Sequence, residues 1–313
     1  MERSASARQQ RNYCGRSSAN RHRRPAHAVS VYCNAAKAIA IECAREHNPR
    51  AATILDAACG RLGDFLKWNQ TMKHLRVLHA FDAEPMQVSE ASRRLRGGRV
   101  TFGSDLFVAD FNEPRDLRQW HARLRGSCDV VACFFALHYA DDLHRTVQHL
   151  VECVKPGGML LLTVLDEEAL RKPLAGELCV WANGLVRVAF DADDRMRYRF
   201  TLDGALQDSD ERVVPTEALD HALRIAGCDA VQRRTIPDML RGSSPGHEAV
   251  RRGTVNRLRQ PLTVAEREVV DLFRVVLATV PPNGGDVSTA QLASARDMPA
   301  TPTAVSASEE KAF

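Results

Sequence analysis

The sequence predicts an α/β fold in which a mostly parallel β-sheet carries helices on both faces. Two observations support this class. Short apolar segments of strand length alternate with segments of helix length from residue 53 to residue 164, and turns with glycine or other small residues separate several of them. In a sheet of this kind the loops after the strands converge on one ligand-binding crevice.

The alternation predicts five strands and five helices in the first half of the chain. The segment 129–135 is apolar almost throughout, as expected for a strand that is buried on both faces. The first helix precedes the sheet and stops at Asn48-Pro49, because proline cannot continue it. The strands are expected at 53–56, 77–82, 105–110, 129–135 and 159–164, and the helices at 28–47, 64–68, 85–95, 116–124 and 142–154.

The second half of the chain follows another pattern. Apolar and polar residues alternate in Leu185–Phe190 and Arg197–Leu202, which predicts antiparallel strands in a small lobe at about 176–214. Residues 239–262 are rich in Gly, Pro, Ser and Arg, which predicts a long mobile loop. Ala265–Val280 is strongly apolar and is compatible with a final strand or a helix.

The composition is that of a soluble globular protein. The 313 residues are 44% hydrophobic and 26% charged, and no apolar run is long enough to span a bilayer. The nine cysteines are scattered without a CxxC pair, which argues against a zinc site and against a disulfide framework. We therefore expect no metal and no association with a membrane.

Both ends of the chain are expected to be disordered. Residues 1–25 carry seven arginines against one acid, Glu2, and residues 281–313 are rich in Pro, Ala, Ser and Thr. A basic arm at 1–27 suits a polyanionic partner, although a solvated tail without a partner explains it equally well. One folded domain at 28–280 remains.

Acidic residues follow three successive predicted strands. Asp56, Asp82 and Asp110 occupy these positions, and a turn with Gly60 and Gly63 follows the first. Small residues let a ligand approach the backbone closely, and the next helix offers free amides. Three acids and no lysine in the turn suit a nucleoside without phosphates, such as S-adenosylmethionine. A nicotinamide cofactor is less well matched, because a full G-x-G-x-x-G is absent, and acids that merely cap helices are the structural alternative.

Two segments resemble motifs of the mRNA cap guanine-N7 methyltransferases. Leu55–Trp68 (LDAACGRLGDFLKW) is similar to the family's L-D-x-G-C-G-K-G-G-D-L-x-K-W, and Cys128–Tyr139 (CDVVACFFALHY) to its F-D-x-x-x-x-Q-F-x-x-H-Y. Weaker similarities follow in the family's order over roughly residues 30–280, at 32–37, 198–202, 211–214 and 263–276.

The resemblance implies the Rossmann-like class I methyltransferase fold, with a seven-stranded sheet and an inserted cap-binding lobe. It implies S-adenosylmethionine as cofactor and the 5′ end of capped RNA as partner, with other capping-enzyme subunits as further partners. The location would be the nucleus, or the cytoplasm if the protein is viral. The implied cofactor residues are Lys37 (toward the carboxylate), Asp56, Gly60, Asp64, Asp82, Asp110 and Phe134, and the implied guanine-pocket residues are Phe135, His138, Tyr139, Glu211 and Phe273.

The chemistry of these roles follows from guanine itself. An acid such as Glu211 can accept from the N1 and N2 hydrogens together, a pairing that adenine cannot offer. Guanine N7 carries a lone pair and no proton, so its methylation needs no general base, and we expect no acid–base catalyst. His138, Tyr139 and Glu211 would act by positioning.

Several positions depart from the family pattern. Ala58 and Leu62 replace glycines of the turn and add bulk where a cofactor would pass. Ala35 replaces a Trp, Phe134 a Gln, Phe273 a Tyr, and Arg212 the aromatic residue after the pocket acid. Two other interpretations therefore stay open. One is a methyltransferase of another small molecule or nucleoside, and the other is a catalytically silent RNA-binding or scaffold protein.

Overall fold

A computed structural model describes residues 26–172, 179–242, 244–258 and 260–282. The basic arm predicted at 1–27 and the tail predicted at 281–313 lie almost entirely outside these residues. Among the described residues, no helix combines the length and the apolar character that a membrane crossing requires.

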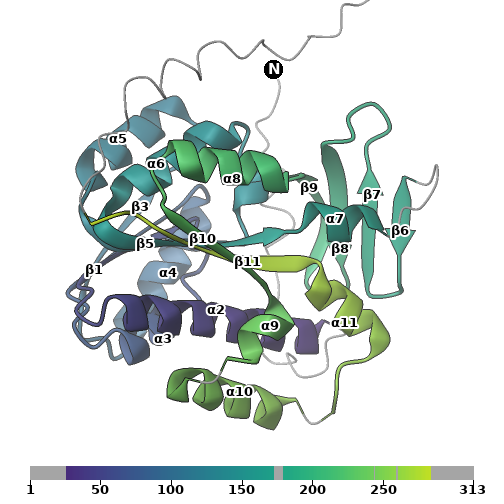
Figure 1. Cartoon of the computed structure of the whole chain (residues 1–313), viewed down its shortest axis with the longest axis horizontal. Helices are drawn as coiled ribbons and strands as arrows, with labels where there is room; N and C mark the ends of the chain where they lie inside the picture. Colours follow the sequence, from purple (N-terminus) through teal and green to yellow (C-terminus); the bar gives the residue numbers. More distant parts are fainter. Residues whose placement is uncertain (1–25, 173–178, 243, 259, 283–313) are drawn as a thin grey trace, which may run out of the picture.

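A seven-stranded, mostly parallel sheet forms the centre of the fold, as predicted (Figure 1). The strand order is β10-β11-β5-β4-β1-β2-β3, with β11 antiparallel to both of its neighbours. The order reverses between β1 and β4, which places a ligand crevice beyond the carboxyl ends of these two strands. The strands are β1 (Thr53–Ala57), β2 (Val77–Asp82), β3 (Gly103–Val108), β4 (Cys128–Phe134), β5 (Val154–Leu165), β10 (Ala230–Thr235) and β11 (Phe273–Thr279).

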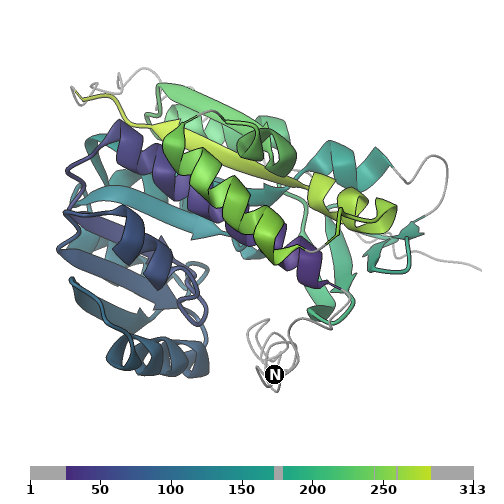
Figure 2. The same ribbon diagram turned by 90° about the horizontal axis from the view of Figure 1, so that it is seen from below.

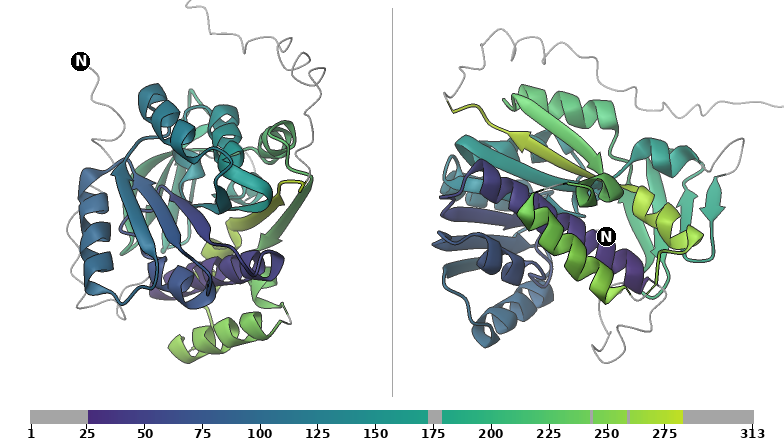
Figure 3. Two further views of the ribbon diagram at one scale, coloured as in Figure 1. Left: turned by 90° about the vertical axis from the view of Figure 1, so that its left-hand side faces the viewer. Right: turned by 60° about the horizontal axis from the view of Figure 1, so that its bottom comes forward.

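Each central strand is apolar on both faces because each face is covered by helices. Neighbours along β1 and β4 enter different cores: Ile54 and Val130 pack on one face, and Leu55 and Val131 on the other. This explains the unbroken apolar run in β4. Figure 3 (left) shows helices on both sides of the sheet.

One face of the sheet carries α5 (Pro114–Leu124), α6 (Leu143–Cys153) and α8 (Thr216–Ile225). The other carries α2 (His27–His47), α3 (Phe65–Thr71), α4 (Pro85–Gly97) and α9 (Ile236–Leu240). The helix α2 is the longest of these and lies across the sheet, with Ile39, Ala40 and Ile41 fully buried. It begins close to its predicted start and ends at the predicted residue, His47.

The predicted antiparallel lobe is a separate four-stranded sheet. After β5, the short helix α7 (Glu167–Arg171) leads to strands in the order β6-β7-β8-β9, all antiparallel. Its apolar side chains, including Val188 and Phe200, continue one of the two cores. These strands are β6 (Val180–Ala182), β7 (Val186–Phe190), β8 (Arg197–Leu202) and β9 (Leu206–Arg212).

The mobile loop predicted at 239–262 is wrong over most of its length, because helix α10 (Pro245–Arg257) occupies it. The Ser244 side chain accepts a hydrogen bond from the His247 amide. Pro245 stands in the first turn, where a backbone amide would have no partner within the helix, so the missing N–H of proline costs nothing. The helix lies along α2 (Figure 2), with Gly246 close against the Glu42 side chain. The composition suggested a loop, but in this helix Gly246 allows close packing against α2 and the arginines lie on the solvent-exposed side.

The apolar stretch 265–280 contains both structures that its pattern allowed. Helix α11 (Val264–Asp271) begins with a capping box, in which Thr263 and Glu266 bond each other's backbone amides. After Leu272 the chain enters β11, whose Val275 and Val276 are fully buried. An apolar pattern alone cannot distinguish these two states.

Candidate functional site

The turn after β1 is tied to the end of β2. The backbone amide of Gly60 donates to Oδ2 of Asp82 (2.8 Å), and the amide of Cys59 donates to the Phe81 carbonyl (2.9 Å). The other Asp82 oxygen accepts from the Glu84 amide (3.0 Å). Each carboxylate oxygen has two acceptor positions, so Asp82 can shape the turn and still accept from a ligand hydroxyl.

Asp110 lies beyond the end of β3, next to the same crevice. Its Oδ1 accepts from the Asn112 amide (2.8 Å), and its own amide donates to Asp116 (3.1 Å). Burial raises the pKa of both Asp82 and Asp110 above the usual aspartate value. The acids predicted at the ends of β2 and β3 therefore stand at the carboxyl edge of the sheet, half-buried.

The Asp64 carboxylate, at the end of the turn after β1, binds the side chains of two lysines. Its Oδ2 accepts from Lys37 Nζ of α2 (2.6 Å), and its Oδ1 from Lys67 Nζ of α3, which also donates to Asn34 (3.0 Å). Burial alone would raise the pKa of Asp64, but the positive charges of Lys37 and Lys67 outweigh it and lower that pKa. Two cations around one ionised acid leave this end of the site able to attract a carboxylate.

Asp56, near the end of β1, has a different environment from Asp64. Its carboxylate is only 3% exposed and accepts from the indole Nε1 of Trp68 (3.1 Å). Burial, followed by the charge of Asp64, raises the pKa of Asp56 to about 7. Asp56 is therefore buried and orients Trp68. Its predicted contact with a cofactor stays a prediction.

Ala58 and Leu62, which stand where the resembled motif has glycine, both have left-handed backbones (φ 52° and 53°). This explains glycine at both places in the motif. The expected steric conflict with a ligand does not arise from Leu62, because its side chain is fully buried in the core on the α2 side of the sheet. Ala58 packs partly buried against the opposite core.

This difference predicts stability changes of opposite sign. Ala58→Gly should stabilise the protein by about 1 kcal/mol, because it relieves the left-handed strain. Leu62→Gly relieves the same strain but deletes a fully buried side chain at a cost of about 3 kcal/mol, for a net loss of about 2 kcal/mol. Urea denaturation of both variants measures these free energies of unfolding, and shifts of the same sign would contradict the assignment.

Phe134, the last residue of β4, and Phe135, which follows it, both lie close to Lys37. Phe134 stacks on Trp68 (centroids 6.5 Å apart), and Phe135 packs edge-on against Phe273 of β11 (5.2 Å). Lys37 Nζ lies 5.8 Å and 5.7 Å from the two phenylalanine ring centroids, within the range of cation–π attraction. Phe135 is a non-glycine residue with φ 56°, a strained backbone of the kind found at ligand sites.

A buried polar cluster joins the 3₁₀ turn η2 (Leu137–Tyr139) to the lobe strand β9. Glu211, 3% exposed, accepts through Oε2 from the hydroxyl of Tyr198 (2.9 Å), and its Oε1 lies 3.8 Å from His138 Nε2. The Tyr139 hydroxyl lies 3.1 Å from Ser209 Oγ. Residues about 70 positions apart in the chain thus meet in one place.

Burial sets the protonation states of this cluster. It raises the pKa of Glu211 to about 7 and lowers the pKa of His138 to about 3. His138 is therefore neutral, and its Nδ1 is buried without a hydrogen-bond partner among the described residues. An orphaned donor or acceptor beside a buried carboxylate is costly unless a ligand completes it.

The structure brings the predicted residues together in two groups. Lys37, Asp64 and Phe134 surround the start of α3, and His138, Tyr139 and Glu211 form the cluster beside the lobe, with Phe135 and Phe273 packed on each other. The expectation that positioning carries the chemistry, without an acid–base catalyst, stays a prediction.

Three residues of the site were missed as site residues by sequence reasoning. Lys67 completes the Asp64 cluster, Ser209 meets Tyr139, and Tyr198 donates to Glu211. Lys67 and Tyr198 had a usable signal, since Lys67 is the lysine of the resembled motif at 55–68 and Tyr198 begins the similar segment at 198–202.

Comparisons with known proteins agree with this geometry. At the level of the fold, the chain is similar to a solved S-adenosylmethionine-dependent methyltransferase from Clostridium acetobutylicum, with a TM-score of 0.50, 14% identity, and coverage of 80% of this chain and 92% of that one. The class I methyltransferase fold predicted from the sequence is thereby confirmed.

The family follows from a more specific match. The model of the mRNA (guanine-N(7))-methyltransferase domain matches residues 4–269, and the chain belongs to this family. It is 28% identical over 188 residues to the mRNA cap guanine-N(7) methyltransferase of Schizosaccharomyces pombe (53% of this chain, 49% of the relative). It is 27% identical over 213 residues to that of Drosophila melanogaster (60% and 48%). The chain thus spans about half the length of these curated relatives.

Proposed function

We propose that this protein transfers the methyl group of S-adenosylmethionine to N7 of the guanine in an RNA 5′ cap. The observation that carries the proposal is the buried cluster of Glu211, Tyr198 and His138 beside the crevice. A buried carboxylate next to an unpartnered imidazole nitrogen suits the edge of a purine that has two hydrogens and a carbonyl. Guanine has this edge, and adenine does not.

The residues of the crevice fit S-adenosylmethionine in charge and shape. The positive charges of Lys37 and Lys67 exceed the negative charges of Asp64 and of Asp56, whose pKa is about 7, and would attract the methionine carboxylate. Asp82, held at the end of β2, would accept from ribose hydroxyls, and Asp110 would accept from the adenine amino group. Membership of the mRNA (guanine-N(7))-methyltransferase family and the similarity to a solved S-adenosylmethionine-dependent methyltransferase support the same cofactor.

The chain's contribution to the reaction is placement. S-adenosylmethionine, when bound, supplies an electrophilic methyl group on a sulfonium. Glu211 would hold the guanine edge and His138 would complete it, while the faces of Phe135 and Phe273 would limit how the ring can tilt. No proton has to be removed from N7, so no side chain needs to act as a base. Partner subunits of a capping enzyme, and a nuclear location (cytoplasmic for a viral protein), stay predictions.

Methyl transfer from labelled S-adenosylmethionine tests the proposal directly. The substrates are RNA ending in GpppN, the same RNA with an ApppN end, uncapped RNA, and free GTP. We expect label on GpppN-RNA alone, at N7 after nuclease digestion. Label on a different small molecule or nucleoside would support a broader methyltransferase, and failure to bind the cofactor would leave a silent RNA-binding protein.

The pKa of Glu211 predicts how this activity depends on pH. Only the carboxylate accepts two guanine hydrogens, and the folded pKa is about 7. We therefore expect kcat/KM for capped RNA to be constant above about pH 7 and to fall below it, approaching tenfold per pH unit. His138, with a pKa of about 3, stays neutral throughout this range. Profiles of the wild type and of Glu211→Gln at constant ionic strength check the assignment, because the variant should lose the inflection near pH 7.

A further inference from the structure

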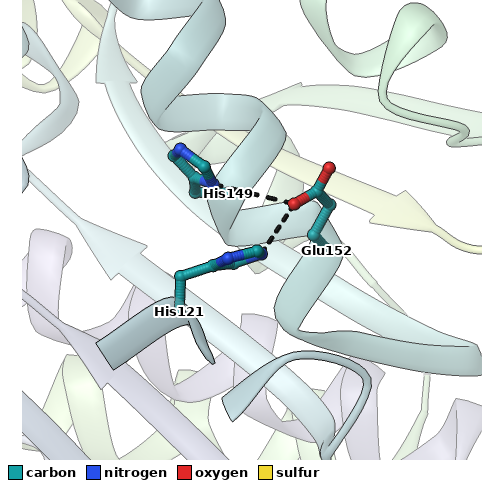
Figure 4. Close-up of side chains that lie close together, drawn as sticks. All are labelled: His121, His149 and Glu152. Carbon is teal, nitrogen blue, oxygen red and sulfur yellow. Dashed lines mark ion pairs between the residues drawn. The ribbon is translucent and has the colours of Figure 1, made fainter. Parts of the chain in front are cut away.

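Two helices bring two imidazoles and a carboxylate together at a place remote from the crevice (Figure 4). His121 lies in the last turn of α5, and His149 and Glu152 lie one turn apart near the end of α6. One ligand atom from each residue lies within 4.8 Å of the others. Oε2 of Glu152 is 2.6 Å from His121 Nε2 and 3.7 Å from His149 Nδ1.

The near partner of both ring nitrogens is one and the same carboxylate oxygen, Oε2 of Glu152. His121 Nε2 and His149 Nδ1 are buried and have no hydrogen bond of good geometry among the described residues. The other oxygen of Glu152 is already engaged, because Gln148 Nε2 donates to Oε1 (2.9 Å). That bond directs Oε2 toward the histidines, the arrangement in which an outer partner orients a metal ligand.

The chemistry of the three side chains also suits a cation. A divalent ion binds imidazole through a ring-nitrogen lone pair, and each of the two rings brings one nitrogen to the cluster. His121 stands in the last turn of α5, where the helix dipole favours positive charge. The nearby cation Arg145 opposes this attraction and also lowers the pKa of His149.

The position of the cluster excludes a direct part in methyl transfer. The Glu152 carbonyl accepts from the Gly126 amide (2.8 Å), just before the first residue of β4. The crevice is formed beyond the carboxyl ends of β1 to β4, whereas the cluster lies near the amino end of β4, at the opposite end of the strands. A ligand bound here would clamp the ends of α5 and α6 to each other.

We propose that His121, His149 and Glu152 form a binding site for a divalent ion, with Zn²⁺ as the preferred metal. Two imidazole nitrogens and one carboxylate oxygen are a frequent zinc ligand set, with bonds of about 2.0–2.1 Å and a fourth position open to water. Ligand atoms around one such ion lie roughly 3.4 Å apart, so small side-chain rotations complete the geometry from the present separations. The sequence-based expectation of no metal site considered the spacing of cysteines and histidines along the chain, and did not consider side chains contributed by two helices.

Metal binding by the full chain tests this proposal without reference to methyltransferase activity. After removal of metals by a chelator, Zn²⁺ is titrated by calorimetry and Co²⁺ by visible absorption. We expect one equivalent of Zn²⁺, Co²⁺ d–d bands without thiolate charge transfer, and a melting temperature that rises with Zn²⁺. His149→Ala and Glu152→Gln should each weaken binding by more than about tenfold, and Gln148→Ala by about tenfold.

His144→Ala is the matched control, since His144 is an exposed histidine of the same helix α6 that lies outside the cluster. It should bind Zn²⁺ like the wild type. Equal affinity in His149→Ala and the wild type, a thiolate signature, or no binding at micromolar Zn²⁺ would overturn the proposal. Metal-free circular dichroism establishes that each variant is folded, and His121→Gln replaces any variant that is not.

Discussion

Glu211→Gln is expected to lower kcat/KM for GpppN-capped RNA by about 100-fold, which corresponds to about 2.7 kcal/mol. Glutamine has the size of glutamate and can still accept from Tyr198. It cannot accept two guanine hydrogens, because its amide nitrogen is a donor. The loss should appear with cofactor affinity unchanged, as measured by equilibrium dialysis of labelled S-adenosylmethionine.

A cap with inosine in place of guanosine sharpens this test, because inosine lacks the N2 amino group. The wild type should prefer guanosine, and Glu211→Gln should lose most of that preference. Asp210→Asn is the matched control, since Asp210 neighbours Glu211 in β9 but is exposed near Arg199. An unchanged preference in Glu211→Gln would place guanine recognition elsewhere.

Asp64→Asn is expected to destabilise the protein by about 3 kcal/mol, because it leaves Lys37 and Lys67 close together with only the charge of Asp56, whose pKa is about 7, to offset them. The two lysine side chains are only 17% and 20% exposed, so solvent screens their repulsion incompletely. Urea denaturation measures the loss. The double variant Asp64→Asn/Lys67→Met should recover part of it, since one of the two like charges is gone.

Binding of S-adenosylmethionine separates the structural role of Asp64 from its role in the site. Asp64→Asn should bind the cofactor weakly even where it is folded, because Lys37 loses the carboxylate that holds it. A loss of stability below about 1 kcal/mol would mean that water compensates the lysines and that this cluster is not truly buried. In that case Lys37 would have to be positioned by its contacts with the phenylalanine rings.

Local patterns were sufficient for several parts of this protein. The buried strand at 129–135, the helix ending at His47 and the alternation at 197–202 each depend on the spacing of apolar residues within a few turns or pleats, and each is present. The motif at 55–68 fixed the family, because an unusual combination of small, acidic and basic residues within 14 positions is shared with it. Residues 239–262 were the failure, since packing against α2 outweighed a composition typical of loops.

What the sequence determined by itself was therefore the class of fold, the family and the positions of the acids at the strand ends, because these are set by residues near one another in the chain. Only the tertiary structure decided which distant side chains meet. It directed Leu62 into the core, buried Asp56 against Trp68, placed Tyr198 on Glu211, and brought His121 to His149. Such contacts depend on strand order and helix packing, which place residues far apart in the chain side by side, and no local spacing encodes them.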